Sequence, residues 1–241
     1  MDRLDIQIPR SWGECSERQL RYLYRLQAAG YAGDAMKALA LTRLANMRIH
    51  RADGSDFLVI AKTGRAVISA ERFASLLSAL DWLDGADTPV RFAKLHGHTA
   101  LPADFSGVPF EIFIICENIF QAAIAANDER AVDALACSLY NCRRITLRDY
   151  ERVMVLRWFA SVKALFARTF PDLFKPATGD DMDMQPLSER LRVSTDAQIR
   201  ALTKGDRTKE REILALDTWR ALTELNAQAK EYEEYRQKSK K

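Results

Sequence analysis

Apolar positions recur at steps of three and four residues through most of the chain, which is the period of an amphipathic helix. The first such stripe follows Ser16, which forms a capping box with Gln19, and Gly30 ends the helix that the stripe predicts. Similar stripes predict helices over 34–46 and 69–83. We therefore expect the chain to begin as a series of short helices.

The period changes to that of extended chain between the second and third of these helices. Runs rich in β-branched and aromatic residues occupy 47–50, 57–61 and 66–69. The turn sequences Ala-Asp-Gly-Ser and Lys-Thr-Gly-Arg separate them, and each contains a glycine. We expect a small β-hairpin or meander over about 47–69.

Two later segments, 110–127 and 147–170, are apolar on nearly all sides, which is typical of helices buried in a core. A shorter helix is expected between them over 129–140. Two more helices, over 187–203 and 208–235, are expected near the C-terminus. The fold class that we predict is mainly α: a multi-helix globular bundle with two buried central helices, one small β-hairpin or meander, and a C-terminal helical pair.

The expected domain boundaries follow from composition. The segment 175–186 is polar, acidic and interrupted by prolines, so it is typical of a linker. It would separate a helical body over 1–174, with its β insertion at 47–69, from the C-terminal pair and basic tail over 187–241.

Composition and charge narrow the classes of protein to consider. Of the 241 residues, 48% are hydrophobic and 29% are charged, as in an ordinary soluble protein. The formal net charge of +3 does not by itself imply a nucleic-acid partner, and no apolar run has the length of a membrane span. The scattered cysteines favour free thiols in a reducing cytosol. We expect a cytoplasmic protein with no membrane partner.

His96 and His98 are the sharpest candidates for metal or proton chemistry. Two imidazoles are too few for a metal site, and no other histidine or cysteine lies near them in sequence. The C-x4-C spacing of Cys137 and Cys142 fits neither a zinc knuckle nor one helical face. We therefore expect no metal site, no cofactor and no enzyme activity, and keep a metal-dependent enzyme at the two histidines as the second alternative.

An excess of arginine over 143–168 gives the first alternative. Arg144, Arg148 and Arg152 could face phosphates as a nucleic-acid-binding module, although the apolar residues around them favour core packing and ion pairs instead. Nucleic acid is accordingly not our expected partner.

The clearest candidate for binding another protein is a stripe on the last predicted helix. Trp219, Leu222 and Leu225 share one face of that helix, opposite a strongly charged face. Such a stripe docks either on the chain's own body or on a partner, and we select it for partner binding. Trp12, near the N-terminus, is added because it either anchors the N-terminus to the body or is exposed for a partner.

Three stretches carry a resemblance to known sequences. They are IPRSWGECSERQL, LPADFSGVPFEIFIICENIF and DAQIRALTKGDRTKEREILALDTWRALTELNAQAKEYEE. They resemble uncharacterised helical proteins of phages and prophages of Bacteroidetes, and the resemblance spans most of the chain. It implies a phage protein of a tail or structural module, and it implies no catalytic residues.

The function that we expect is non-enzymatic and acts through protein–protein interactions. The protein would be a tail-assembly chaperone or a structural component of the virion, located in the cytoplasm of a bacterial host or in the phage particle. Its partners would be phage structural proteins, a tail subunit or a tape-measure protein, and self-association is left open.

Overall fold

The capping box of the sequence is formed as hydrogen bonds in the structure, a computed structural model that describes residues 6–53, 56–61, 64–85, 88–175 and 186–239. Both halves of the capping box between Ser16 and Gln19 are present at the start of α1 (Glu17–Ala28). Gly30, at φ 84°, follows its last turn. Because these signals act between near neighbours in sequence, the sequence alone predicted them correctly.

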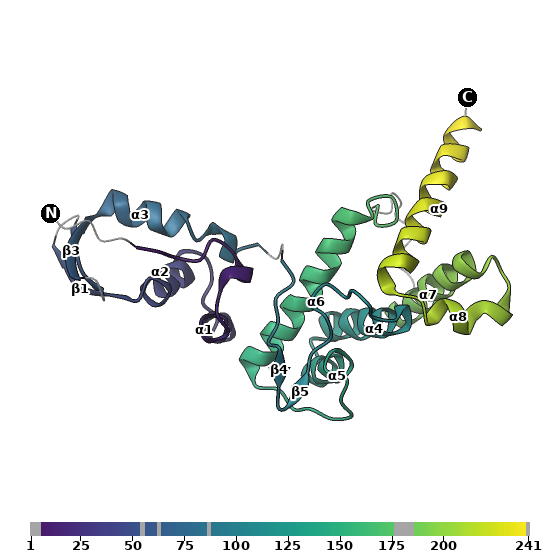
Figure 1. Ribbon diagram of the computed structural model, residues 1–241, viewed down its shortest axis with the longest axis horizontal. Helices are drawn as coiled ribbons and strands as arrows, with labels where there is room; N and C mark the ends of the chain where they lie inside the picture. The colour runs from purple at the N-terminus through teal and green to yellow at the C-terminus, as the bar shows by residue number, and fades with distance from the viewer. Residues whose placement is uncertain (1–5, 54–55, 62–63, 86–87, 176–185, 240–241) are drawn as a thin grey trace. The chain divides into compact units, whose positions relative to one another are not determined.

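Helices predominate in the described part of the chain, which confirms the expected mainly α fold (Figure 1). The chain divides into two units, which are described separately. Unit 1 comprises Met1–Val90 and Arg148–Met154, and unit 2 comprises Arg91–Leu147 and Val155–Lys241. No helix in the described residues is both long and apolar enough to cross a membrane.

Unit 1 combines short helices with a meander of three antiparallel strands. Its elements are η1 (Trp12–Glu14), α1, α2 (Gly33–Leu44), β1 (Met47–Asp53), β2 (Asp56–Ala61), β3 (Gly64–Ser69), α3 (Ala70–Ser78), η2 (Asp81–Leu83) and the first turn of α6 (Asp149–Thr169). The strand order is β1-β2-β3, and the register of β1 shifts between Ile49 and Arg51. The predicted β element is therefore confirmed as a meander. Ser69, where the third predicted helix begins, caps α3, but α3 ends at Ser78 and the separate η2 follows it.

Unit 2 contains the aromatic core of the protein. It holds β4 (Lys94–Leu95), β5 (His98–Thr99), α4 (Phe110–Ala126), α5 (Glu129–Leu139), the rest of α6, α7 (Leu187–Thr203), η4 (Arg207–Lys209), α8 (Glu210–Leu214) and α9 (Thr218–Lys238). The rings of Phe105, Phe113 and Phe159 pack together at centroid distances of 5.8–6.2 Å. Within unit 2, α6 is buried along much of its length, whereas α4 exposes Ile115 and Ile124 on its outer side, so the expectation for α4 is only partly met.

The C-terminal region differs from the expected arrangement in two respects. Its helices belong to unit 2 together with α4 and α5, so the units do not divide at the expected linker 175–186, most of which lies outside the described residues. The single helix expected over 208–235 is also wrong. It is interrupted, and the long helix begins only at Thr218.

Candidate functional site

The start of α9 is fixed by a segment far away in sequence. Phe110 N–H donates to the Leu216 carbonyl at 2.8 Å, and Thr218 N–H donates to the Val108 carbonyl at 2.8 Å. The Thr218 hydroxyl also donates to that carbonyl, at 2.7 Å. These bonds replace the helical bonds of this turn, so the chain is extended there and α9 takes its direction from the loop before α4.

Asp217 holds this junction with both of its carboxylate oxygens. Oδ1 accepts the Arg220 N–H at 3.2 Å and so caps α9, and Oδ2 accepts the Gly107 N–H at 2.7 Å. Gly107 lies at φ 71°, a backbone conformation that favours glycine. One side chain therefore both begins the helix and fastens it to the loop before α4.

The first half of α9 packs within unit 2. Leu222 and Leu225 are only 1% and 4% exposed. Trp219 is half-buried, its ring meets those of Phe166 and Phe170 edge-on at 5.2 and 5.7 Å, and its Nε1 donates to the Asp104 carbonyl at 2.8 Å. In this structure the predicted partner-binding stripe thus serves as core, because the body of unit 2 covers the face that the sequence pattern leaves available.

The second half of α9 is more exposed to solvent than the first half. Asn226 Oδ1 accepts the backbone N–H groups of Asp172 and Leu173 at 2.9 and 3.0 Å, which ties the middle of the helix to the turn after α6. Beyond that point, Tyr232 is 68% exposed and Tyr235 is 72% exposed. The stripe therefore continues past the part of unit 2 that buries it. In the described part of the chain, the side chains of Tyr232 and Tyr235 are exposed to solvent.

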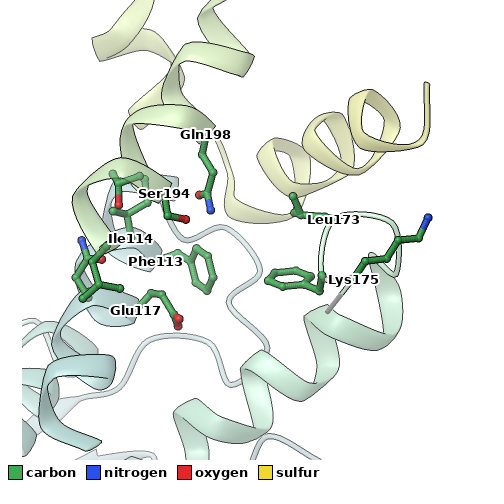
Figure 2. A pocket seen from close by; sticks show the side chains of 11 residues that line it. Phe113, Ile114, Glu117, Leu173, Lys175, Ser194 and Gln198 are labelled. Atoms are coloured by element: carbon green, nitrogen blue, oxygen red, sulfur yellow. The ribbon is translucent and has the colours of Figure 1, made fainter. Parts of the chain in front are cut away.

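A pocket of about 300 Å³ lies beside the same turn. Its lining comes from three segments: Phe113, Ile114, Glu117 and Asn118 from α4, Leu173, Phe174 and Lys175 from the turn, and Leu191, Ser194, Thr195 and Gln198 from α7. Figure 2 labels residues from each of the three segments around the pocket. The lining mixes apolar walls with polar groups, and its size is at the lower end of ligand pockets. It would admit a side chain of a partner or a small ligand.

The carboxylate of Glu117 in this pocket is held by a neighbouring helix. Glu117 Oε1 accepts Lys163 Nζ at 2.6 Å and Gln121 Nε2 at 2.8 Å. Lys163 also lies 5.2 Å from the centroid of the Phe120 ring. Glu117 Oε2 is buried without a hydrogen bond from any described residue. The Glu117–Lys163 ion pair thus joins α4 to α6 at one side of the pocket.

The two histidines lie in and directly after the turn of a short hairpin. His96 and Gly97 are the central residues of the β4–β5 hairpin, both at positive φ (49° and 88°), which is the two-residue turn that fits a twisted hairpin. His98 begins β5 and is exposed. Within the described residues, no group of three or more potential ligands lies close enough together to hold a metal.

The three arginines of the nucleic-acid alternative fall in different units. Arg144 belongs to unit 2, whereas Arg148 and Arg152 belong to unit 1. Arg144 and Arg148 are exposed, and Arg152 is half-buried and pairs with Asp149 at 3.2 Å. The ion pair of Arg152 agrees with the interpretation that these arginines take part in core packing and ion pairs.

Trp12 is a core residue of unit 1. Its ring stacks on Tyr24 at 5.4 Å and meets Trp82 edge-on at 5.5 Å, and its Nε1 donates to the Trp82 carbonyl at 3.1 Å. Trp12 therefore anchors the N-terminal segment within unit 1 and is not exposed for a partner.

The residues that the sequence did not single out are Tyr232 and Tyr235. Their exposure depends on where the body of unit 2 ends along α9. The sequence contains only one signal, an aromatic residue seven positions after Leu225, and that signal is the same for a buried and an exposed stripe.

Comparison with known proteins adds no relative: no protein-family model, no curated protein and no solved structure matches this chain.

Proposed function

We propose that this protein acts by binding another protein, and that the C-terminal half of α9 is its binding surface. The observation that carries the proposal is the exposure of Tyr232 and Tyr235 on the half of α9 that follows Asn226. Tyrosine is enriched at protein interfaces because its ring offers apolar area while its hydroxyl group keeps a polar partner. A helix that presents two such rings suits an apolar groove or a second helix.

Helix energetics support the same surface. α9 has 21 residues and so extends about 31 Å. Isolated helices of fewer than about 12–15 residues are marginal in water, because most helix stability in proteins comes from packing of one face. The half beyond Asn226 gains little such packing from the described residues, and a partner on the Tyr232 face would supply it.

The pocket beside the turn after α6 extends this surface. Leu173, which lines the pocket, is bound through its N–H to Asn226 of α9. The hydrogen bond with Asp172 raises the pKa of Lys175, and the charge of Glu233 on α9 adds a small effect in the same direction. A partner lying along α9 could therefore place one side chain in the pocket.

The narrower form of the proposal follows the resemblance to phage and prophage proteins. In that form the partner is a phage structural protein, a tail subunit or a tape-measure protein, and the chain is a tail-assembly chaperone or a component of the virion. A chaperone would cover an apolar surface of the unassembled subunit, whereas a virion component would keep the contact permanently.

The test is co-purification after co-expression with each protein encoded by the neighbouring genes. The variant Tyr232→Asp/Tyr235→Asp places charge on the proposed surface, and Tyr31→Asp is the matched control because Tyr31 is 45% exposed in unit 1. We expect wild type and Tyr31→Asp to retain the same partner and the double variant to lose it by at least tenfold, which is the effect of removing interface anchors.

Circular dichroism spectra must be the same for the three chains. Equal retention by the double variant would refute the surface. Light scattering supplies a further check: a wild-type dimer that the double variant abolishes would assign the surface to a second copy of this chain, against the proposal of a different protein.

A further inference from the structure

The C-terminal end of α5 places two cysteines together by backbone geometry. Asn141 lies at φ 45°, the left-handed conformation that commonly ends a helix. Cys142 N–H donates to the Cys137 carbonyl at 2.9 Å, and Asn141 N–H donates to the Ser138 carbonyl at 3.4 Å. These are the two hydrogen bonds of a Schellman motif, in which the chain reverses over the last turn of the helix.

Cys137 and Cys142 occupy the two positions of that motif whose side chains meet. In many proteins an apolar contact is made there. Here both residues are thiols, and the pKa of Cys142 is raised, mainly by burial and next by the neighbouring Cys137 side chain. Five-residue spacing separates side chains on a straight helix, so the reversal at Asn141 explains why this pair was not recognised from the sequence.

Both thiols are also accessible. Cys137 and Cys142 are half-buried free cysteines, whereas Cys116 is buried. A disulfide requires nearby backbones and side chains that point toward each other, and the motif supplies both.

We propose that Cys137 and Cys142 are a modification site that forms a reversible disulfide across the C-terminal end of α5. The oxidant is a low-molecular-weight disulfide such as glutathione disulfide. One cysteine loses its proton to solvent, and its thiolate attacks a sulfur of glutathione disulfide, which gives a mixed disulfide and releases one glutathione thiolate.

The second cysteine then completes the exchange. It loses its proton and attacks the protein sulfur of the mixed disulfide, so that the Cys137–Cys142 bond forms and the second glutathione leaves as a thiolate. Both thiolates take up protons from solvent. The protein loses two protons and two electrons, and one glutathione disulfide becomes two glutathione molecules.

The oxidised form would hold the reversal covalently and fix the start of the loop from α5 to α6. Reduction by excess glutathione would restore the two thiols. This device is independent of the surface proposed on α9, since its residues and its readout lie on a different element.

The sequence offers a direct readout, because trypsin cleaves after Arg130 and Arg143 and leaves both cysteines in one peptide, 131–143. The full chain is treated with excess glutathione disulfide under native conditions, then unfolded, alkylated and digested. We expect peptide 131–143 to lack both alkyl groups and two hydrogen atoms, and Cys15 and Cys116 to be alkylated. In Cys137→Ser, we expect Cys142 to carry glutathione as the trapped mixed disulfide.

Backbone variants test whether the Schellman motif is responsible. Asn141→Val disfavours the left-handed conformation, and we expect it to lower the equilibrium constant for disulfide formation about tenfold. Asn141→Gly permits that conformation and should stay within about twofold of wild type. Asn127→Val is the matched control, because Asn127 ends α4 at φ 47° but is not part of the pair.

Alkylation of both cysteines in peptide 131–143 after oxidation would overturn the proposal, and so would glutathione on each cysteine in place of a bond between them. An equal loss in Asn141→Val and Asn127→Val would overturn the geometric explanation.

Discussion

Replacement of Asp217 should destabilise the start of α9, because this one carboxylate caps the helix and also accepts a hydrogen bond from the loop before α4. The cap to Arg220 N–H contributes about 1 kcal/mol. The bond to Gly107 N–H contributes about 1 kcal/mol more, toward the lower end for a charged acceptor because the site is exposed to solvent. Asp217→Ala should therefore destabilise the start of α9 by about 2 kcal/mol.

Amide hydrogen exchange followed by mass spectrometry measures this loss in the helix itself. A change of about 2 kcal/mol corresponds to about thirtyfold faster exchange in residues 218–225. Asp128→Ala is the matched control, since Asp128 caps α5 through Arg130 N–H with no long-range bond of its side chain in the described residues. It should accelerate exchange in α5 by only about fivefold, as expected for about 1 kcal/mol.

The difference between the two variants isolates the bond to Gly107. We compare the acceleration at the start of α9 in Asp217→Ala with the acceleration in α5 in Asp128→Ala. If the first is no larger than the second, the stabilising role of the bond between Asp217 and Gly107 is refuted. Asp217→Asn, which keeps a carbonyl acceptor, should lie between wild type and Asp217→Ala.

Two further predictions concern Cys116 and the Glu117–Lys163 ion pair. Burial, with a smaller effect of Glu117, raises the pKa of Cys116 to about 12. The native state therefore keeps a proton that the unfolded chain loses, and stability should fall as pH rises from about 9 toward 12, by at most about 1.4 kcal/mol per pH unit for this thiol. Urea unfolding at several pH values should show a smaller slope for Cys116→Ala, and an unchanged slope would refute the assignment. Lys163→Met removes the 2.6 Å partner of Glu117 and should destabilise unit 2 by about 1–2 kcal/mol, since the pair is only partly buried. Thermal unfolding should show the loss, and Glu117→Gln in the same chain should restore most of it. Unchanged thermal stability of Lys163→Met would show that the pair does not stabilise unit 2.

Local signals were the part of the fold that the sequence could predict. The cap at Ser16, the cap at Ser69 and the three strands all depend on residues within a few positions of one another. The break before α9 depends instead on bonds to residues 107–110, which are about 110 positions away in sequence. No periodicity within 208–235 contains that information.

The candidate surface shows the same limit. Leu222, Leu225 and Tyr232 follow one helical stripe, and the pattern gives no reason to separate them. Their burial differs because the packing of unit 2 ends near Asn226, which is a property of α4, α6 and α7 together. The pairing of Cys137 with Cys142 was hidden for a related reason, because it depends on the backbone conformation of Asn141.

Site-specific photo-crosslinking tests the central claim most directly, because it reports contact at a chosen residue in the intact protein. A photoreactive phenylalanine derivative would replace Tyr232 or Tyr235 in turn, and Tyr31 in the control, in cells that produce the chain with its neighbouring gene products. We predict one discrete crosslinked protein from both positions on α9 and none from position 31. Absence of any adduct from positions 232 and 235, with the chain folded and the label incorporated, would contradict the proposal that this half of α9 binds a partner.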